Sequence, residues 1–137
     1  MKTALLLIAH GSREPGANAD LQALAESLRR DAAYHCVEAS FLELAEPGIE
    51  EAGARCVEQG ANCVVLLPYF LSAGVHVRRD LTGYRDRLAE RFPAAAFRLA
   101  EPLGPHPLLV QIIQERAGAA RDSSYKPNAP AKALRSG

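Results

Sequence analysis

Four apolar runs alternate with amphipathic stretches along this chain, and that alternation constrains its fold more than any other feature. Each run is short enough to be a single buried strand, and the third is the most apolar, as expected of a central parallel strand. In the stretches after the runs, apolar residues recur at intervals of three and four, which is the spacing of one helix face. The expected strands are residues 3–9, 36–42, 63–70 and 95–100.

Four helices are expected, one after each strand, and each has an apolar stripe. Pro47 suits the first turn of the second helix, and Gly60 suits the position just beyond its end. Pro93 is expected to end the third helix. The stripes are Leu21, Leu24, Ala25 and Leu28; Ile49, Ala52, Cys56 and Val57; Val77, Leu81, Tyr84 and Leu88; and Leu108, Leu109, Ile112 and Ile113.

Strands that alternate with helices of this length predict an α/β fold with right-handed crossovers. We expect a three-layer, doubly wound, four-stranded parallel sheet in the chelatase-like or flavodoxin-like order 2-1-3-4, where the order is taken by analogy. The expected domain is residues 1–117. Residues 118–137 lose the periodicity and gather Pro, Ser, Ala and Lys, which predicts a disordered C-terminal tail.

Composition argues against several classes of function. The chain has 16 basic and 16 acidic residues and a formal net charge of +0, so nothing favours nucleic acid or an anionic membrane surface as a partner. The N-terminal apolar run is very short for a signal peptide, and no run approaches the ~20 residues of a membrane span. Three cysteines without a C-x-x-C pair suit core positions in a reducing compartment. We therefore expect a cytoplasmic protein.

Three side chains suited to metal and proton chemistry follow the first three strands. His10 comes directly after the first strand, Glu43 after the second and His76 past the third. In the order 2-1-3-4 these strand ends are neighbours, at the edge where open parallel sheets bind ligands. Two imidazoles and a carboxylate suit cobalt, iron(II) or nickel, and a neutral imidazole also accepts protons near neutral pH. We predict that these three residues are both the metal-binding and the catalytic residues.

The segments around these positions resemble a known family. The runs LLLIAHGSREP, FLELAEPGIEEA, LLPYFLSAGVHVRRDL and AEPLGPHPLL are similar, in order and spacing, to the four signature segments of the small, single-domain sirohydrochlorin cobaltochelatases and ferrochelatases, which are class II chelatases. The resemblance covers residues 3–116. It implies that His10 and His76 are the metal-handling and proton-accepting pair, with Glu43 assisting.

The same resemblance implies the reaction. An enzyme of this family inserts a divalent metal, Co²⁺ or Fe²⁺, into the tetrapyrrole sirohydrochlorin in cobalamin or sirohaem biosynthesis. The metal is a substrate, so no permanently bound cofactor is expected. Two histidines and a glutamate suit Ni²⁺ as well, and the class also contains a nickel chelatase.

Further residues are candidates for holding the tetrapyrrole. The loop at residues 72–75 resembles a backbone cradle at a helix start, where free N–H groups favour an anion. Arg78 and Arg79 are candidates for binding the substrate carboxylates, although an exposed helix face explains them equally well. His35 and His106 are assigned structural or exposed roles. The predicted ligand-binding residues are Ser12, Arg13, Ser72, Gly74 and Val75.

Two other functions would use the same features. The sequence around His10 superficially resembles the R-H-G core of histidine phosphatases, but Ala9 stands where those enzymes need an arginine, which disfavours phosphoryl transfer. A non-catalytic tetrapyrrole or metal carrier on the same fold would bind through the same groups. Turnover separates that carrier from an enzyme.

A homodimer is expected, because a flat macrocycle must be gripped on both faces and one such domain offers a single strand-end surface. Longer members of the family have a second repeat that this chain lacks, and a two-fold pair is the commonest closed oligomer. A monomer that leaves one face of the ring in solvent is the alternative.

Overall fold

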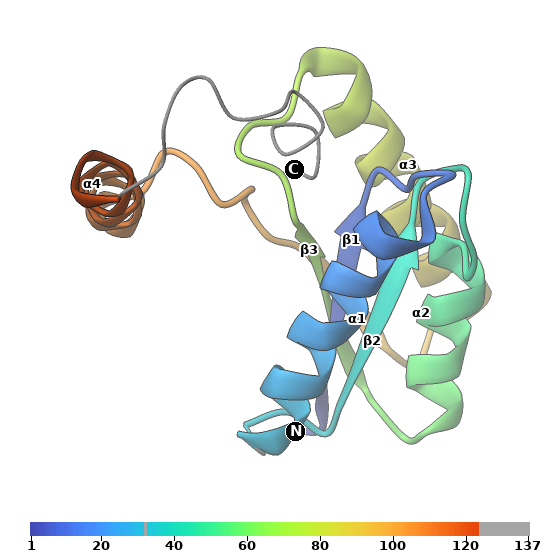
Figure 1. Cartoon of the computed structure of the whole chain (residues 1–137). Helices are drawn as coiled ribbons and strands as arrows, with labels where there is room; N and C mark the ends of the chain where they lie inside the picture. Colours follow the sequence, from blue (N-terminus) through green and yellow to red (C-terminus); the bar gives the residue numbers. More distant parts are fainter. Residues whose placement is uncertain (32, 124–137) are drawn as a thin grey trace. The chain divides into compact units, whose positions relative to one another are not determined.

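Four parallel strands form one sheet in the computed structural model, which describes residues 1–31 and 33–123. The sheet belongs to a compact unit that spans Met1–Gly104. Its order is β2-β1-β3-β4, which confirms the predicted α/β class and strand order (Figure 1). The elements of this unit are β1 (Thr3–Ala9), α1 (Pro15–Arg30), β2 (Cys36–Phe41), α2 (Ile49–Glu58), β3 (Cys63–Pro68), α3 (Val75–Arg91) and β4 (Ala96–Leu99).

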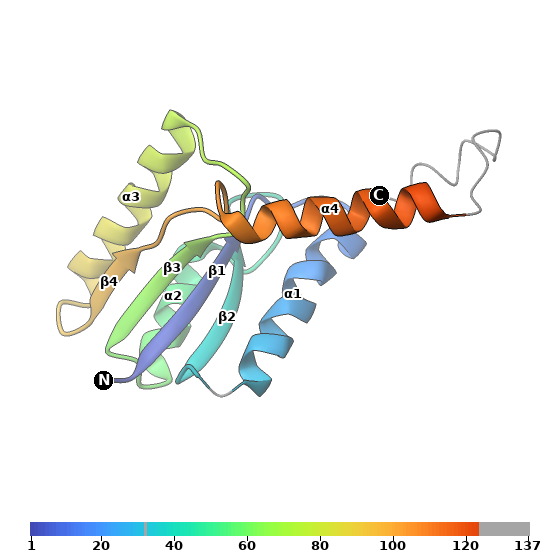
Figure 2. The ribbon, with the colours of Figure 1, turned by 90° about the vertical axis from the view of Figure 1, so that its left-hand side faces the viewer.

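β1 lies inside the sheet, between β2 and β3, and is buried on both faces. Its even-numbered residues Ala4, Leu6 and Ile8 belong to a core shared with α2 and α3, whereas Leu5 and Leu7 belong to a second core shared with α1. Figure 2 shows α1 on one side of the sheet and α2 and α3 on the other. All five residues are at most 5% exposed. Complete burial of one leucine stabilises a fold by about 1.5–3 kcal/mol, so this strand anchors both layers.

The predicted apolar stripes of the first three helices are the faces that pack on the sheet. Leu21 of α1 and Leu81 and Leu88 of α3 are among the largest fully or almost fully buried side chains. Gly60 follows α2 with a φ of 101°, the left-handed conformation that glycine adopts beyond a helix end. Both the helix positions and this helix end are therefore confirmed.

One predicted helix boundary is wrong. Pro47 does not lie in the first turn of α2, which begins at Ile49 with Gly48 as its N-cap residue. The amide N–H of Phe41 donates to the carbonyl oxygen of Pro47 at 3.0 Å, and Phe41 forms a bridge with Gly48. This segment therefore pairs with the end of β2 before the helix begins. The last three strands are also one or two residues shorter at their ends than predicted, since the chain there already turns into loops.

A second unit begins at Pro105 and contains α4 (Pro107–Asp122). His106 precedes this helix, and its Nδ1 accepts a hydrogen bond from the N–H of Leu108 at 3.1 Å, which is a structural role. No residue of α4 is buried. The helix continues past the expected domain end at residue 117, because the alanines and arginine that follow are strong helix formers. Residues 124–137 of the expected tail lie outside the described residues.

The cysteines are free thiols that contribute to the core. Cys56 and Cys63 are buried, and Cys36 is half-buried. Burial raises the pKa of the Cys56 thiol far above its usual value, and burial likewise raises the pKa of Cys36. These thiols are therefore protonated at neutral pH. Among the helices of the described residues, none has the length and apolar character needed to cross a membrane.

Candidate functional site

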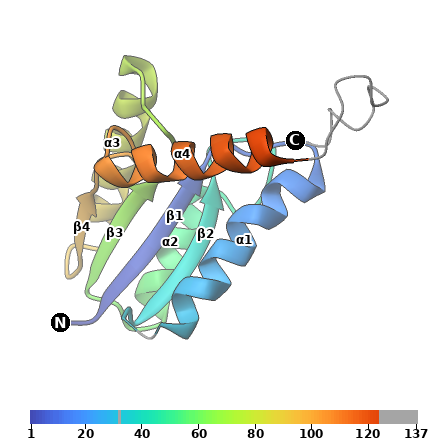
Figure 3. The same ribbon diagram turned by 60° about the vertical axis from the view of Figure 1, so that its left-hand side comes forward.

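The candidate site lies where the parallel strands end, and the first two strand ends are joined beyond the sheet. The four strand arrows point the same way in Figure 3, so the loops that follow them share one edge. The N–H of Leu42 donates to Ala9 O at 2.9 Å, and the N–H of Glu43 donates to His10 O at 3.0 Å. Backbone pairing thus places Glu43 beside His10, as the strand order predicted.

Gly11 makes this close approach between the two loops possible. Its φ is 95°, which side chains rarely tolerate, and a Cβ atom at this position would lie 1.7 Å from the carbonyl oxygen of Glu43. No larger residue fits without separating the two loops. The position of His10 relative to Glu43 therefore depends on a glycine directly after the histidine.

His10 is an exposed side chain that stacks on a buried one. Its ring centroid lies 4.3 Å from that of Phe70, with an angle of 25° between the planes, while Phe70 itself is 6% exposed. Stacking covers one face of the imidazole, while the His10 side chain as a whole stays exposed. Phe70 comes from the β3–α3 loop, so His10 is held by a loop other than its own. Sequence reasoning missed Phe70, because only the fold brings the two rings together.

Asn18 of α1 stabilises the loop that follows His10. Its side-chain amide donates to Ser12 O at 2.7 Å and accepts from the Ser12 N–H at 3.0 Å. The Ser12 hydroxyl accepts from the N–H of Glu14 at 3.0 Å. Ser12 was predicted to bind the ligand. In the structure its backbone and hydroxyl groups form hydrogen bonds within the loop and to Asn18. Arg13, the next predicted binding residue, is exposed.

The β3–α3 loop leads to His76, which lies in the first turn of α3 and is exposed. The predicted cradle residues Ser72 and Gly74 are exposed as well, and Val75 is 70% exposed. Gly74 is the N-cap residue of α3, and no side chain caps the helix start. Backbone N–H groups at an uncapped helix start can bind an anion, and anion binding by this loop stays a prediction.

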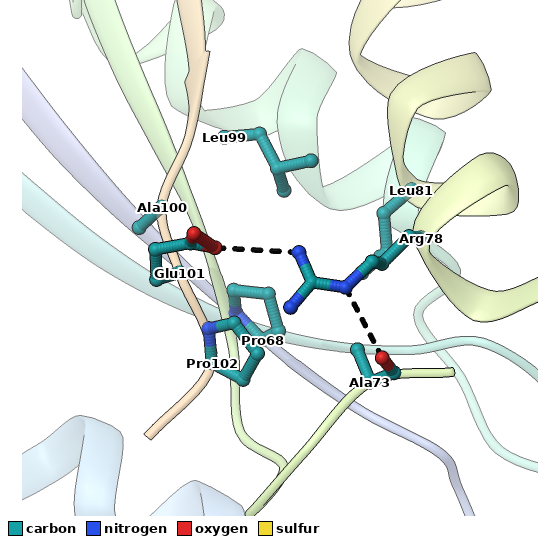
Figure 4. Close-up of a pocket in the computed structure, with 8 residues that line it drawn as sticks. All are labelled: Pro68, Ala73, Arg78, Leu81, Leu99, Ala100, Glu101 and Pro102. Carbon is teal, nitrogen blue, oxygen red and sulfur yellow. Dashed lines mark hydrogen bonds and ion pairs between the residues drawn. The ribbon is translucent and has the colours of Figure 1, made fainter. Parts of the chain in front are cut away.

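A hollow of about 280 Å³ lies beside this loop, between the ends of β3 and β4 (Figure 4). The Arg78 side chain crosses it: Nε donates to Ala73 O at 3.1 Å, and Nη1 lies 3.4 Å from Oε2 of Glu101. Glu101 was not identified from the sequence, where it is one of many charged residues. The remaining walls are formed by Pro68, Leu81, Leu99, Ala100 and Pro102.

Comparison with known proteins identifies the family. A model of the CbiX family matches residues 4–120. The chain belongs to the CbiX family. It is 35% identical over 112 residues to the chloroplastic sirohydrochlorin ferrochelatase of Arabidopsis thaliana, an alignment that covers 82% of this chain and 50% of that protein. It is 36% identical over 116 residues to the sirohydrochlorin cobaltochelatase of Sulfolobus acidocaldarius, with 85% of this chain and 90% of that protein covered.

A solved structure agrees with this membership of the CbiX family. The sirohydrochlorin chelatase SirB from Bacillus subtilis subspecies spizizenii, in complex with cobalt, matches with a TM-score of 0.79 and 32% identity, covering 86% of this chain and 50% of that one. The chain thus spans about half the length of SirB and of the Arabidopsis relative, and most of the length of the Sulfolobus relative.

The three predicted metal ligands of this CbiX-family chain are not gathered into one cluster. Within the part of the chain that the structure describes, no three His, Cys, Asp or Glu side chains lie close enough together to hold a metal ion. Backbone hydrogen bonds place His10 next to Glu43, whereas His76 lies in the first turn of α3. The roles of His10, His76 and Glu43 stay predictions. His35, excluded from the site, contacts Gln59 O at 2.7 Å through Nε2 instead.

Proposed function

We propose that this CbiX-family chain is a cytoplasmic chelatase that inserts Co²⁺ or Fe²⁺ into sirohydrochlorin. One observation supports this most: an exposed histidine, His10, is held by stacking on Phe70 at the strand-end edge. Relatives with which the chain shares about a third of its residues are named sirohydrochlorin ferrochelatase and cobaltochelatase. Cobalamin and sirohaem biosynthesis are the pathways in which such a product is used.

The chemistry requires groups of the kind found at this edge. Metal insertion exchanges two pyrrole protons of the free macrocycle for one divalent ion, which must also lose its bound water. A neutral imidazole can accept a proton or act as a transient metal ligand. In the proposal, His10 and His76 fill these two roles, and the Glu43 carboxylate favours the approach of the cation and the departure of the protons.

A second copy of the chain supplies the opposite wall of the site in this proposal. The macrocycle is flat, and one strand-end edge can cover only one of its faces. α4 offers apolar surface for such contact, since Leu108, Val110, Ile112 and Ile113 are 47–65% exposed. Light scattering at the working concentration tests this: a fully active particle near 14.7 kDa would contradict the dimer.

Spectroscopy of metal insertion tests the function itself. Sirohydrochlorin is incubated with the protein and with Co²⁺, Fe²⁺ or Ni²⁺ in turn, and the visible spectrum is followed against the uncatalysed rate. A chelatase releases many equivalents of metallated product for each chain. A carrier binds one equivalent and stops, and that result would contradict the proposal.

A further inference from the structure

We propose that Arg78 binds a carboxylate of the tetrapyrrole substrate and that Glu101 occupies the carboxylate position until the substrate displaces it. This inference rests on the proposed function, since sirohydrochlorin is a polycarboxylate. Three features that lie together at the ends of β3 and β4 support this inference: an oriented guanidinium, an exposed carboxylate and a small hollow (Figure 4).

The guanidinium of Arg78 is oriented by the backbone before any ligand arrives. Nε donates to the carbonyl oxygen of Ala73 at 3.1 Å, so the side chain folds back over the β3–α3 loop. The outer nitrogens remain, and one of them meets Glu101. A planar guanidinium offers its outer N–H groups in a forked geometry that matches a carboxylate. An oriented fork loses less conformational freedom on binding than a free arginine would.

Glu101 has the properties of an occupant that an incoming carboxylate can displace. Its side chain is 82% exposed, that of Arg78 is 54% exposed, and their closest atoms are 3.4 Å apart. Exposed ion pairs of this kind contribute little to stability, because water and salt screen them. A substrate carboxylate that replaced Glu101 would therefore give up little existing interaction.

The size and place of the hollow suit one acid side chain of the substrate, not the ring. About 280 Å³ is below the ~300–1,000 Å³ of pockets that enclose whole drug-sized ligands. Leu81, Leu99 and Pro102 provide apolar walls for a methylene stem. Arg78 follows His76 by two residues on α3, and Pro68, at the end of β3, pairs with Ile8 just before His10. An anchored acid arm would thus hold the macrocycle at the edge that carries both histidines.

Titration of metal-free sirohydrochlorin tests the inference, with binding followed by its absorbance. We expect Arg78→Gln to weaken binding about tenfold, the effect of losing a charge-assisted contact. Arg78→Lys keeps the positive charge but loses the forked geometry of the guanidinium. Its affinity for sirohydrochlorin should therefore lie between those of wild type and Arg78→Gln. Glu101→Gln removes the competing carboxylate and should strengthen binding about two- to fivefold. In the double variant this gain should disappear, because Arg78 is what Glu101 competes for.

The same helix offers a matched control pair. Arg87 and Glu50 form an ion pair of 2.9 Å with side chains 55% and 44% exposed, between α3 and α2. Arg87→Gln and Glu50→Gln make the same charge changes on a pair that does not line the hollow, so the affinity should stay within about twofold of wild type. Far-UV circular dichroism checks that every variant is folded.

The outcomes separate this inference from the proposed function. If wild type and Arg78→Gln bind sirohydrochlorin with equal affinity, Arg78 does not anchor a carboxylate and the inference is overturned. The proposed function stays intact in that case, because the wild-type chain still binds its substrate. Weaker binding in Glu101→Gln, like that in Arg78→Gln, would show that the pair only supports the loop and would also overturn the inference. A wild-type chain that binds no sirohydrochlorin would refute the proposed function, and the inference with it.

Discussion

The loop that carries His10 and the segment that carries His76 are built differently, although both lie at the same edge. The first is crowded: its backbone pairs with Glu43, Asn18 bonds to it, and Phe70 covers the imidazole. The second is open: a Cβ at Gly74 would meet no atom within 4 Å, and His76 is exposed. One histidine is thus positioned by contacts within the domain, whereas the other is exposed in the first turn of a helix. In the proposed mechanism, His10 therefore suits a fixed position in the site, and His76 suits a group that contacts the ligand or a second chain.

The largest expected effect comes from exchanging glycine for alanine in the two loops. Gly11→Ala places a methyl group against the Glu43 carbonyl at a φ of 95°, so we expect a loss of at least about 3 kcal/mol in unfolding free energy. Gly74→Ala has open space and a φ of −73°, so its effect should stay within about 1 kcal/mol. Denaturant titration measures both. Equal stability of the two variants would contradict the described difference in packing between the two loops.

Removal of either imidazole is expected to have the next largest effect. His10→Ala and His76→Ala should each lower the rate of metal insertion at least about 100-fold, the usual contribution of a positioned acid or base. Both side chains are exposed, so the fold should survive, as circular dichroism would show. His35→Gln serves as the control histidine at the other end of the sheet. Undiminished turnover in the two site variants would remove them from the mechanism.

The stacking of His10 on Phe70 gives a smaller, sharper test of the comparison. Phe70→Leu keeps an apolar side chain but loses the flat surface, so we expect kcat to fall about tenfold with little change in KM for sirohydrochlorin. Phe70→Tyr keeps the ring and should retain most of the activity. If the leucine and tyrosine variants behave alike, Phe70 fills space and does not orient the imidazole.

The smallest effect is expected at Glu43. Its backbone is held against His10, but its side chain is exposed, and screened charges of this kind are worth up to about 1 kcal/mol. Glu43→Gln should therefore slow insertion no more than about fivefold. Rates at low and high salt distinguish this screened role from direct ligation. A loss as large as that in His10→Ala would place Glu43 among the metal ligands.

Sequence reasoning located the two central strands best because each is a nearly continuous apolar run, residues 3–9 and 63–68. It placed Pro47 wrongly because the pairing of that segment with Phe41 overrides the usual preference of proline for a first helical turn. It placed His10 and His76 in the loops beyond strand ends because strand ends can be read from the sequence. It missed Phe70, Asn18 and Glu101 because their roles arise from neighbours distant in the chain. The apolar stripe predicted for α4 also differs from the others, since none of its residues is buried.

The protonated state of the core thiols makes this chain suitable for site-specific labelling. Alkylating dyes react with thiolates, and burial disfavours the thiolates of Cys36 and Cys56 by raising the pKa of each. Cys63 is 4% exposed, which shields it from reagents in the folded protein. A single cysteine introduced at an exposed polar position of α4, such as Gln114→Cys, would therefore take up a fluorophore in preference to the native thiols. Energy transfer between donor- and acceptor-labelled chains could then report how closely two copies approach.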